Sequence, residues 1–167
     1  IVTWNVNSIR RRLDSVLSWL ERERPDVVCL QETKCTDDVF PWIGFQALGF
    51  EVSFTGQRSY NGVAIVSLSP QEDVDVDPLG TPAPERRSIA ATIHGVRVVN
   101  VYVPHGESVG TEKFRTKLLW LDRLNEMLRE AGDQRLVVSG DFNVAPDDRD
   151  VYDPRLRREK LICSTPE

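Results

Sequence analysis

The sequence predicts an α/β layered domain, and three observations support that fold class. Short apolar runs, typical of buried strands, recur along the 167 residues. Two longer stretches repeat apolar residues every three or four positions, as amphipathic helices do. No linker, low-complexity segment or internal repeat interrupts residues 1–145. Because strands with helices packed over them form layers around one core, we expect a single domain over residues 1–167.

The first half of the chain predicts a strand, a helix and a hairpin. Residues 1–5 (IVTWN) form a short strand, and a helix follows from Ser8 to Arg24, where Pro25 ends it. The apolar face of this helix carries Leu13, Val16, Leu17 and Leu20. Residues 26–32 are a second buried strand, followed by a loop with the letters FPW. Residues 50–55 and 62–69 then pair as a hairpin.

The second half continues the alternation of strands and helices. The acidic stretch 72–77 alternates with a period of two and predicts an exposed edge strand. Residues 88–93 and 96–103 form another hairpin around a His-Gly turn, and a helix spans Glu112 to Glu130. The predicted core face of that helix is Phe114, Leu118, Leu121, Leu124 and Leu128. The strand RLVVS follows, and the polar residues from 147 onward predict a long loop.

The charge distribution leaves a polyanionic partner possible although the formal net charge is −5. Residues 35–85 hold eight acidic side chains and one arginine, so the remainder of the chain is slightly basic. Four basic clusters stand out in that remainder: residues 10–12, Arg86 with Arg87, Lys113 to Lys117, and residues 155–160. Most such clusters are solvated surface, but they also permit contact with phosphates.

The cysteines and the hydropathy pattern indicate a soluble, cytoplasmic protein. Cys29, Cys35 and Cys163 lack the spacing of a metal site, and a chain of this size does not need disulfides. We therefore expect structural thiols in a reducing compartment. No apolar run approaches the roughly 20 residues of a membrane span, so no membrane partner is expected.

Polar side chains follow the apolar runs at four predicted strand ends. The stretch GDFNVAP, residues 140–146, places Asp141 and Asn143 two positions apart, where strand residues share a face. A turn of Gly, Asp, Asn and Pro is the simpler explanation for this stretch. The other three ends carry Asn5 with Asn7, Glu32, and Tyr102 with His105. Together they supply hard oxygen ligands, a phosphate contact and a group to orient water, as metal-assisted phosphate chemistry requires.

The motifs WNVNSIR, QETK, GVAIVS, VYVPHGES and GDFNVAP, in this order, resemble the exonuclease III family of apurinic/apyrimidinic endonucleases. That family belongs to the wider endonuclease, exonuclease and phosphatase superfamily. The resemblance covers the chain from Ile1 to about Pro146. It implies a two-layer β-sandwich flanked by helices, as in deoxyribonuclease I. It also implies Mg²⁺- or Mn²⁺-dependent cleavage of double-stranded DNA at abasic sites and trimming of 3′ ends, by a protein that is a monomer when full length.

Residue by residue, the resemblance assigns roles to the polar strand ends. Glu32 matches the metal-binding glutamate, and Asn5 a neighbouring amide that is a ligand or an orienter. Tyr102 matches the tyrosine that contacts the scissile phosphate. Asp141 matches the aspartate that positions water, protonates the leaving group or contacts the metal, and Asn143 an amide that binds phosphate or metal. Substrate contacts are expected from Asn7, Arg87 and His105.

Two departures from the family pattern qualify these expectations. His105 stands where relatives carry Asn or Gln, and the family's later Ser-Asp-His-x-Pro segment does not occur in this sequence. We therefore expect an N-terminal portion of the family's domain, nearly inactive by itself. Two alternatives stay open. One is another phosphoesterase of the same superfamily that acts on lipid, inositol or RNA phosphates. The other is a shortened relative that binds DNA without cutting it.

Overall fold

The computed structural model describes residues 1–81, 85–157 and 159–167, and these form two compact units. The first unit comprises Ile1–Tyr102 and Ala131–Asp141, and the second comprises Val103–Glu130 and Phe142–Glu167. The basic cluster at 155–160 includes Arg158, which lies outside the described residues. The expectation of a single domain over the whole chain stays a prediction.

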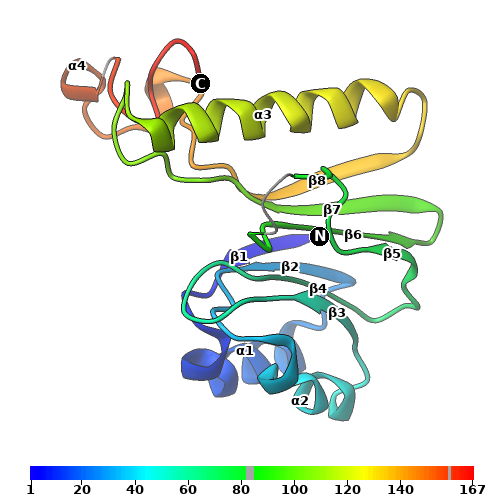
Figure 1. Cartoon of the computed structure of the whole chain (residues 1–167). Helices are drawn as coiled ribbons and strands as arrows, with labels where there is room; N and C mark the ends of the chain where they lie inside the picture. Colours follow the sequence, from blue (N-terminus) through cyan, green and yellow to red (C-terminus); the bar gives the residue numbers. More distant parts are fainter. Residues whose placement is uncertain (82–84, 158) are drawn as a thin grey trace. The chain divides into compact units, whose positions relative to one another are not determined.

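Among the described residues, the strands of the first unit form two four-stranded sheets (Figure 1). The first sheet has the order β1-β2-β4-β3. Its strands are β1 (Val2–Asn5), β2 (Val27–Gln31), β3 (Glu51–Thr55) and β4 (Val63–Ser67). β1 lies parallel to β2, while β4 runs antiparallel to both β2 and β3. The predicted hairpin of β3 and β4 is confirmed.

The second sheet has the order β5-β6-β7-β8. Its strands are β5 (Glu72–Asp75), β6 (Ser88–Ile93), β7 (Val96–Tyr102) and β8 (Leu136–Asp141). β5 is exposed along its whole length at the edge of this sheet, so the acidic edge strand is confirmed. β6 and β7 form the predicted hairpin, and β8 joins β7 in parallel with Tyr102 opposite Asp141.

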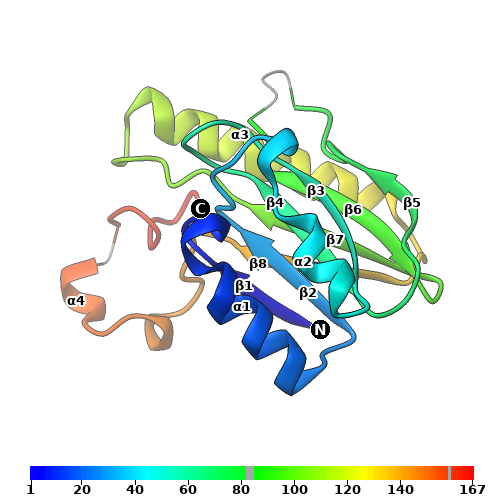
Figure 2. The same ribbon diagram turned by 90° about the horizontal axis from the view of Figure 1, so that it is seen from below.

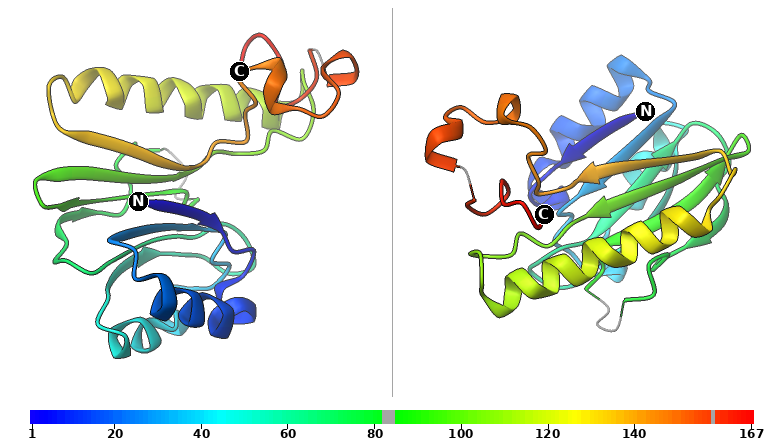
Figure 3. Two further views of the ribbon diagram at one scale, coloured as in Figure 1. Left: turned by 180° about the vertical axis from the view of Figure 1, so that it is seen from behind. Right: turned by 90° about the horizontal axis from the view of Figure 1, so that it is seen from above.

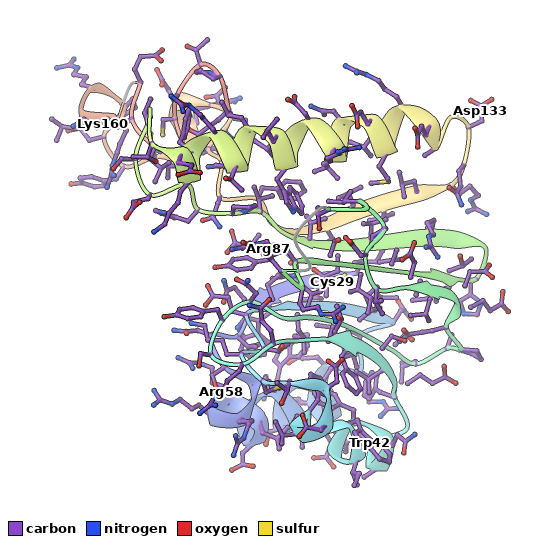
Figure 4. All side chains as sticks on the ribbon, viewed as in Figure 1. Cys29, Trp42, Arg58, Arg87, Asp133 and Lys160 are labelled. Atoms are coloured by element: carbon purple, nitrogen blue, oxygen red, sulfur yellow. The ribbon has the colours of Figure 1, made fainter. Side chains whose placement is uncertain are left out.

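The two sheets pack face to face as a sandwich, as the view from behind shows (Figure 3). Branched side chains of β2 and β4 meet those of β6 and β7 in a shared core. Cys29 lies inside this core (Figure 4), where burial raises the pKa of its thiol to about 12. The thiol therefore stays protonated and packs as a small apolar group. Cys29 and Cys35 are buried free thiols, whereas Cys163 is only partly buried, and the structural role expected of Cys163 stays a prediction.

The outer face of the first sheet is covered by α1 (Ile9–Glu23) and α2 (Trp42–Ala47) (Figures 1 and 2). α1 buries Ile9, Val16 and Leu20 against this face, close to the predicted stripe. The loop predicted after β2 is found only in part: Phe40 and Pro41 lie outside helix and strand, but a short 3-10 turn at Asp37–Val39 precedes them and α2 begins at Trp42. α2 has only six residues, too few for a helical period to show in the sequence.

The second unit contains α3 (Glu112–Glu130), with the bounds that the sequence predicted. Its buried side chains are Phe114, Lys117, Trp120 and Leu124. The prediction of Leu128 as a core residue was wrong, since it is exposed. Among the described residues after Asp141, regular structure is limited to a 3-10 turn at Asp148–Asp150 and the one-turn helix α4 (Pro154–Arg157). No helix in the described ranges is both long enough and apolar enough to cross a membrane.

Candidate active site

Four side chains of the first unit converge where strands of both sheets end. Asn5 and Asp141 are the last residues of β1 and β8, and Tyr102 is the last residue of β7. Glu32 directly follows β2. Parallel pairing places Asn5 beside the end of β2 and Tyr102 beside Asp141. The facing sheets then bring the two pairs together, which joins residues 136 positions apart in sequence.

The amide of Asn5 connects the two carboxylates of this cluster. Asn5 Nδ2 donates to Glu32 Oε1 at 2.9 Å and to Asp141 Oδ2 at 2.9 Å. Asn5 Oδ1 accepts a hydrogen bond from the backbone N–H of Asn7 at 3.1 Å. The side-chain nitrogen of Asn5 thus faces the two carboxylates, and its oxygen faces the backbone of Asn7. Asn5, Glu32 and Asp141 thus lie together, whereas Asn143, which was expected to converge with them, belongs to the second unit.

Tyr102 is held between Glu32 and Arg87. Its hydroxyl donates to Glu32 Oε1 at 3.0 Å, and the guanidinium of Arg87 lies 4.9 Å from the centre of its ring. Arg87 also forms an ion pair with Glu85 at 2.5 Å. Burial and the negative charge of Glu32 raise the pKa of the Tyr102 hydroxyl to about 12. The hydroxyl therefore stays protonated at neutral pH and can act as a donor.

Lys34 is a member of the cluster that the sequence analysis did not single out. Its ammonium lies 2.5 Å from Glu32 Oε2 and 2.6 Å from Asn7 Oδ1. Both Glu32 and Lys34 have positive φ values, +55° and +53°, so the chain turns sharply through QETK and brings alternate side chains together. The available signal was the basic residue two positions after Glu32, but a sequence does not reveal backbone angles.

The Glu32 carboxylate is ionised under ordinary conditions. Burial alone would raise its pKa, but hydrogen bonds from Lys34, Asn5 and Tyr102 outweigh burial and lower it. The ionised carboxylate of Glu32 thus lies next to the protonated hydroxyl of Tyr102. The carboxylate can attract a cation, and the hydroxyl can donate a hydrogen bond.

Asn143 and His105 belong to the second unit. Asn143 Nδ2 donates to Val103 O at 2.9 Å, and the carbonyl of Asn143 accepts from the ammonium of Lys117 at 2.6 Å. The premise that Asp141 and Asn143 share a strand face was wrong, because β8 ends at Asp141 and Asn143 has a φ of +49°. His105 is exposed on its loop. The roles assigned to both residues stay predictions.

Two basic residues expected at a DNA surface are held inside the protein instead. Lys117 is fully buried and pairs with Glu167, so its side chain cannot reach a phosphate. Arg87 keeps 15% of its side-chain surface exposed and is occupied by Glu85 and Tyr102. Helical periodicity explains Lys117, since it lies three residues after Phe114 on the buried face of α3.

The donor set of the cluster fits a hard divalent cation such as Mg²⁺. Glu32 and Asp141 are carboxylates held by one amide group, and oxygen ligands suit Mg²⁺. In the part of the chain that the structure describes, no group of three or more His, Cys, Asp or Glu side chains could hold a metal. Mg²⁺ commonly uses one or two carboxylates and completes its shell with waters and substrate phosphates, so two acids suffice.

Residues 2–164 match the endonuclease/exonuclease/phosphatase family. The chain belongs to that family. Exodeoxyribonuclease III of Haemophilus influenzae is 31% identical over 160 residues, which is 90% of this chain and 59% of that protein. As a member of the family, the chain has the α/β fold with two sheets that its resemblance implied.

Two solved structures of family relatives superimpose on nearly the whole chain. The 3′ phosphatase NExo of Neisseria, bound to a product DNA hairpin, gives a TM-score of 0.92 at 44% identity, over 98% of this chain and 65% of that one. An AP endonuclease from Archaeoglobus fulgidus gives 0.92 at 42% identity, over 97% of this chain and 64% of that one. The chain thus spans about two thirds or less of each of these relatives.

Proposed function

We propose that the protein carrying this chain is a metal-dependent DNA-repair nuclease. It cleaves the phosphodiester at abasic sites in double-stranded DNA and removes nucleotides or blocking groups from 3′ ends. The observation that carries the proposal is the cluster in which one amide, Asn5, holds Glu32 and Asp141 while Tyr102 donates to Glu32. Relatives named as an exodeoxyribonuclease, a 3′ phosphatase and an AP endonuclease support DNA as the substrate.

In this proposal, Glu32 and Asp141 would hold Mg²⁺ or Mn²⁺. The cation would supply positive charge for the phosphate oxygens as negative charge develops on them. Asn5 is assigned as an orienter rather than a ligand, because its nitrogen faces both acids while its oxygen accepts from Asn7.

Four side chains of this chain have separate roles in the proposed reaction at the phosphate. Tyr102, protonated because its pKa is about 12, would turn its one hydroxyl hydrogen from Glu32 to a phosphate oxygen. Lys34 adds a positive charge next to the cluster, where its ammonium contacts both Glu32 and Asn7. Asp141, whose carboxylate the Asn5 amide holds in place, orients the attacking water. Arg87 acts on Tyr102, by packing over its ring, more than on DNA.

An assay on the full-length protein tests this function. Duplex DNA with one abasic-site analogue and duplexes with a recessed 3′ end are incubated with Mg²⁺, with Mn²⁺ or with a chelator. Cleavage should require the metal and should fall steeply in Glu32→Gln, which keeps the shape of the side chain and removes its charge. Preference for lipid, inositol or RNA phosphates would favour the alternative that the protein is another phosphoesterase of the same superfamily. Tight DNA binding without cleavage would favour a non-catalytic relative.

A further inference from the structure

Two amide side chains, Gln31 and Asn100, are buried between the sheets directly behind the candidate active site. Gln31 is 1% exposed and Asn100 is fully buried. Gln31 Nε2 donates to Asn100 Oδ1 at 2.7 Å, which joins β2 of the first sheet to β7 of the second. Amides cost free energy in an apolar core, and apolar side chains of the same size would fill this space. The pair therefore requires an explanation other than packing.

The hydrogen bonds of this pair reach four strands. Gln31 Nε2 also lies within hydrogen-bond distance of Thr3 Oγ1 of β1 at 3.0 Å and of Cys29 O of β2 at 2.9 Å, so its two hydrogens are shared among three acceptors. Asn100 Nδ2 donates to Leu30 O of β2 at 2.8 Å and to Ala64 O of β4 at 2.8 Å. Hydrogen bonds are directional, whereas apolar contacts tolerate sliding. This buried network of directional bonds therefore fixes one spacing and one register between the sheets.

Gln31 and Asn100 lie deeper between the sheets than Glu32 and Tyr102, to which they are close in sequence. Gln31 immediately precedes Glu32, and Asn100 lies two residues before Tyr102, on the same face of β7. The hydrogen bond from Tyr102 to Glu32 crosses between the same two strand ends at 3.0 Å. Any change in the separation of β2 from β7 would change that distance directly.

We propose that Gln31 and Asn100 are positioning residues, whose hydrogen bond sets the distance between the Glu32 carboxylate and the Tyr102 hydroxyl. Their effect on turnover rests on the function proposed above. Their effect on geometry does not, so the two ideas can fail separately. Gln31 and Asn100 touch no substrate in this proposal and act only through Glu32 and Tyr102.

Three variants of the full-length protein separate positioning from stability: Gln31→Met, Asn100→Leu and the two combined. Each single variant leaves one buried amide without its partner, so its melting temperature should fall. The double variant removes both amides and should recover the part of that loss that comes from the unpaired amide, while Leu30 O and Ala64 O still lose the bonds from Asn100. Because a misplaced reacting group slows chemistry, kcat on abasic duplex should fall roughly 10- to 100-fold in all three, with KM changed little. Recovery of kcat together with melting temperature in the double variant would overturn the proposal.

A second measurement needs no activity. The side-chain amide signals of Asn5, assigned in ¹⁵N NMR spectra with Asn5→Ser, report its bonds to Glu32 and Asp141. These signals should shift in the stable double variant. Gln71→Met is the matched control, because Gln71 bonds to Ile65 O and Ser67 Oγ, and Ser67 lies opposite Val27 at the other end of β2.

Asn5 signals that shift in the double variant and not in Gln71→Met support the positioning role, even if the wild-type protein fails to cut DNA. Asn5 signals unchanged in the double variant contradict it, even if the protein is a nuclease. Equal shifts in the double variant and in Gln71→Met also contradict it, because the effect would then be a general loosening of the sandwich.

Discussion

The Tyr102 hydroxyl illustrates how a few neighbours set the chemistry of one side chain. Burial and the Glu32 charge make its deprotonation unfavourable, while Arg87 acts weakly in the opposite direction. A phenol with a pKa of about 12 is a poor base and a dependable hydrogen-bond donor near neutral pH. Its proposed task is therefore to stabilise charge on the phosphate rather than to move a proton.

Removing this hydroxyl should slow the reaction and leave the fold intact. We expect Tyr102→Phe to lower kcat by roughly 10²-fold or more, the usual effect of losing one donor to a developing negative charge. The control is Tyr152→Phe, because Tyr152 is an exposed tyrosine. Steady-state kinetics on abasic duplex and a thermal melt measure the two effects. Equal rates for wild type and Tyr102→Phe would remove Tyr102 from the mechanism.

The Glu32 carboxylate should contribute stability that depends on pH. Its pKa is lowered in the folded protein, so the contribution is fully present above the ordinary value of 4.5 and is lost as pH falls below it. We expect Glu32→Gln to lower the melting temperature at pH 7, and the difference from wild type to shrink as pH falls below 4.5. A difference that stays constant as pH falls below 4.5 would show that the ionised carboxylate of Glu32 contributes no stability.

At the scale of a strand, β8 reaches the site only because Gly140 lets it approach β7. A Cβ at this position would lie 2.0 Å from the carbonyl oxygen of Val101, which no side-chain movement can relieve. Tyr102 and Asp141, the next pair in the register, depend on this close approach. The glycine of GDFNVAP is thus required by strand packing and not only by a turn.

Gly140→Ala should push β8 away from β7 and displace Asp141. We expect a loss of stability of about 1–3 kcal/mol, typical of overpacking, and a larger fall in kcat than the stability loss explains. Gly95→Ala is the matched control, since Gly95 has a φ of +71° but open space around its missing side chain. Denaturant unfolding with kinetics on abasic duplex compares the two. Similar kcat values for both variants would contradict the role of Gly140.

In the second unit, α3 is tied to the chain after β8 through Lys117. The buried ammonium binds the carbonyl of Asn143 and the carboxylate of Glu167, which also accepts from Ser164. Burial alone would raise the pKa of Glu167, but Lys117 and Ser164 outweigh burial and lower it. Glu167 therefore stays ionised and is neutralised by Lys117.

Breaking this pair on one side should destabilise the second unit strongly. Lys117→Met leaves a charged Glu167 buried without a counter-ion, which typically costs about 3–5 kcal/mol. Lys117→Met with Glu167→Gln removes both charges and should recover most of that loss. Thermal unfolding and protease resistance of residues 142–167 measure the effect. A double variant as unstable as the single one would mean that the ion pair is not what holds the segment.

Sequence periodicity predicted those strands and helices in which the order of polar and apolar residues follows the exposed and buried positions. β5 alternates acids along an exposed edge, and α3 repeats apolar residues over five turns, so both were predicted correctly. α2 was missed because six residues carry no period.

At the site, residue types indicated Glu32 and Asp141, but the Asn5 bridge spans 136 positions and Lys34 depends on positive φ angles. Such contacts follow from tertiary structure and leave no local signal.

Over the whole molecule, charge is distributed unevenly around the first unit. The acidic strand β5 forms one edge of the second sheet. Arg10, Arg11 and Arg12 are exposed in the first turn of α1, and Arg12 donates to the carbonyl of Asn7 at 2.6 Å. Since Asn7 also bonds to Asn5 and Lys34, this turn lies next to the candidate active site. Arg87 and Lys117 are occupied internally, whereas this exposed basic turn next to the site suits a DNA backbone.

The salt dependence of DNA binding should measure this surface. Each phosphate neutralised contributes about 0.9 to the slope of log affinity against log salt, because counterions are released from DNA. Arg10→Ala with Arg11→Ala should therefore weaken binding to uncleaved abasic duplex and lower the slope by about 1–2. Arg22→Ala is the matched control, since Arg22 lies at the other end of α1 and pairs with Glu23 at 2.7 Å. Fluorescence anisotropy at several salt concentrations, in the presence of a chelator to prevent cleavage, gives both slopes. If the double variant and Arg22→Ala keep the wild-type slope, phosphates do not contact the first turn of α1, and DNA must approach the strand ends from another side.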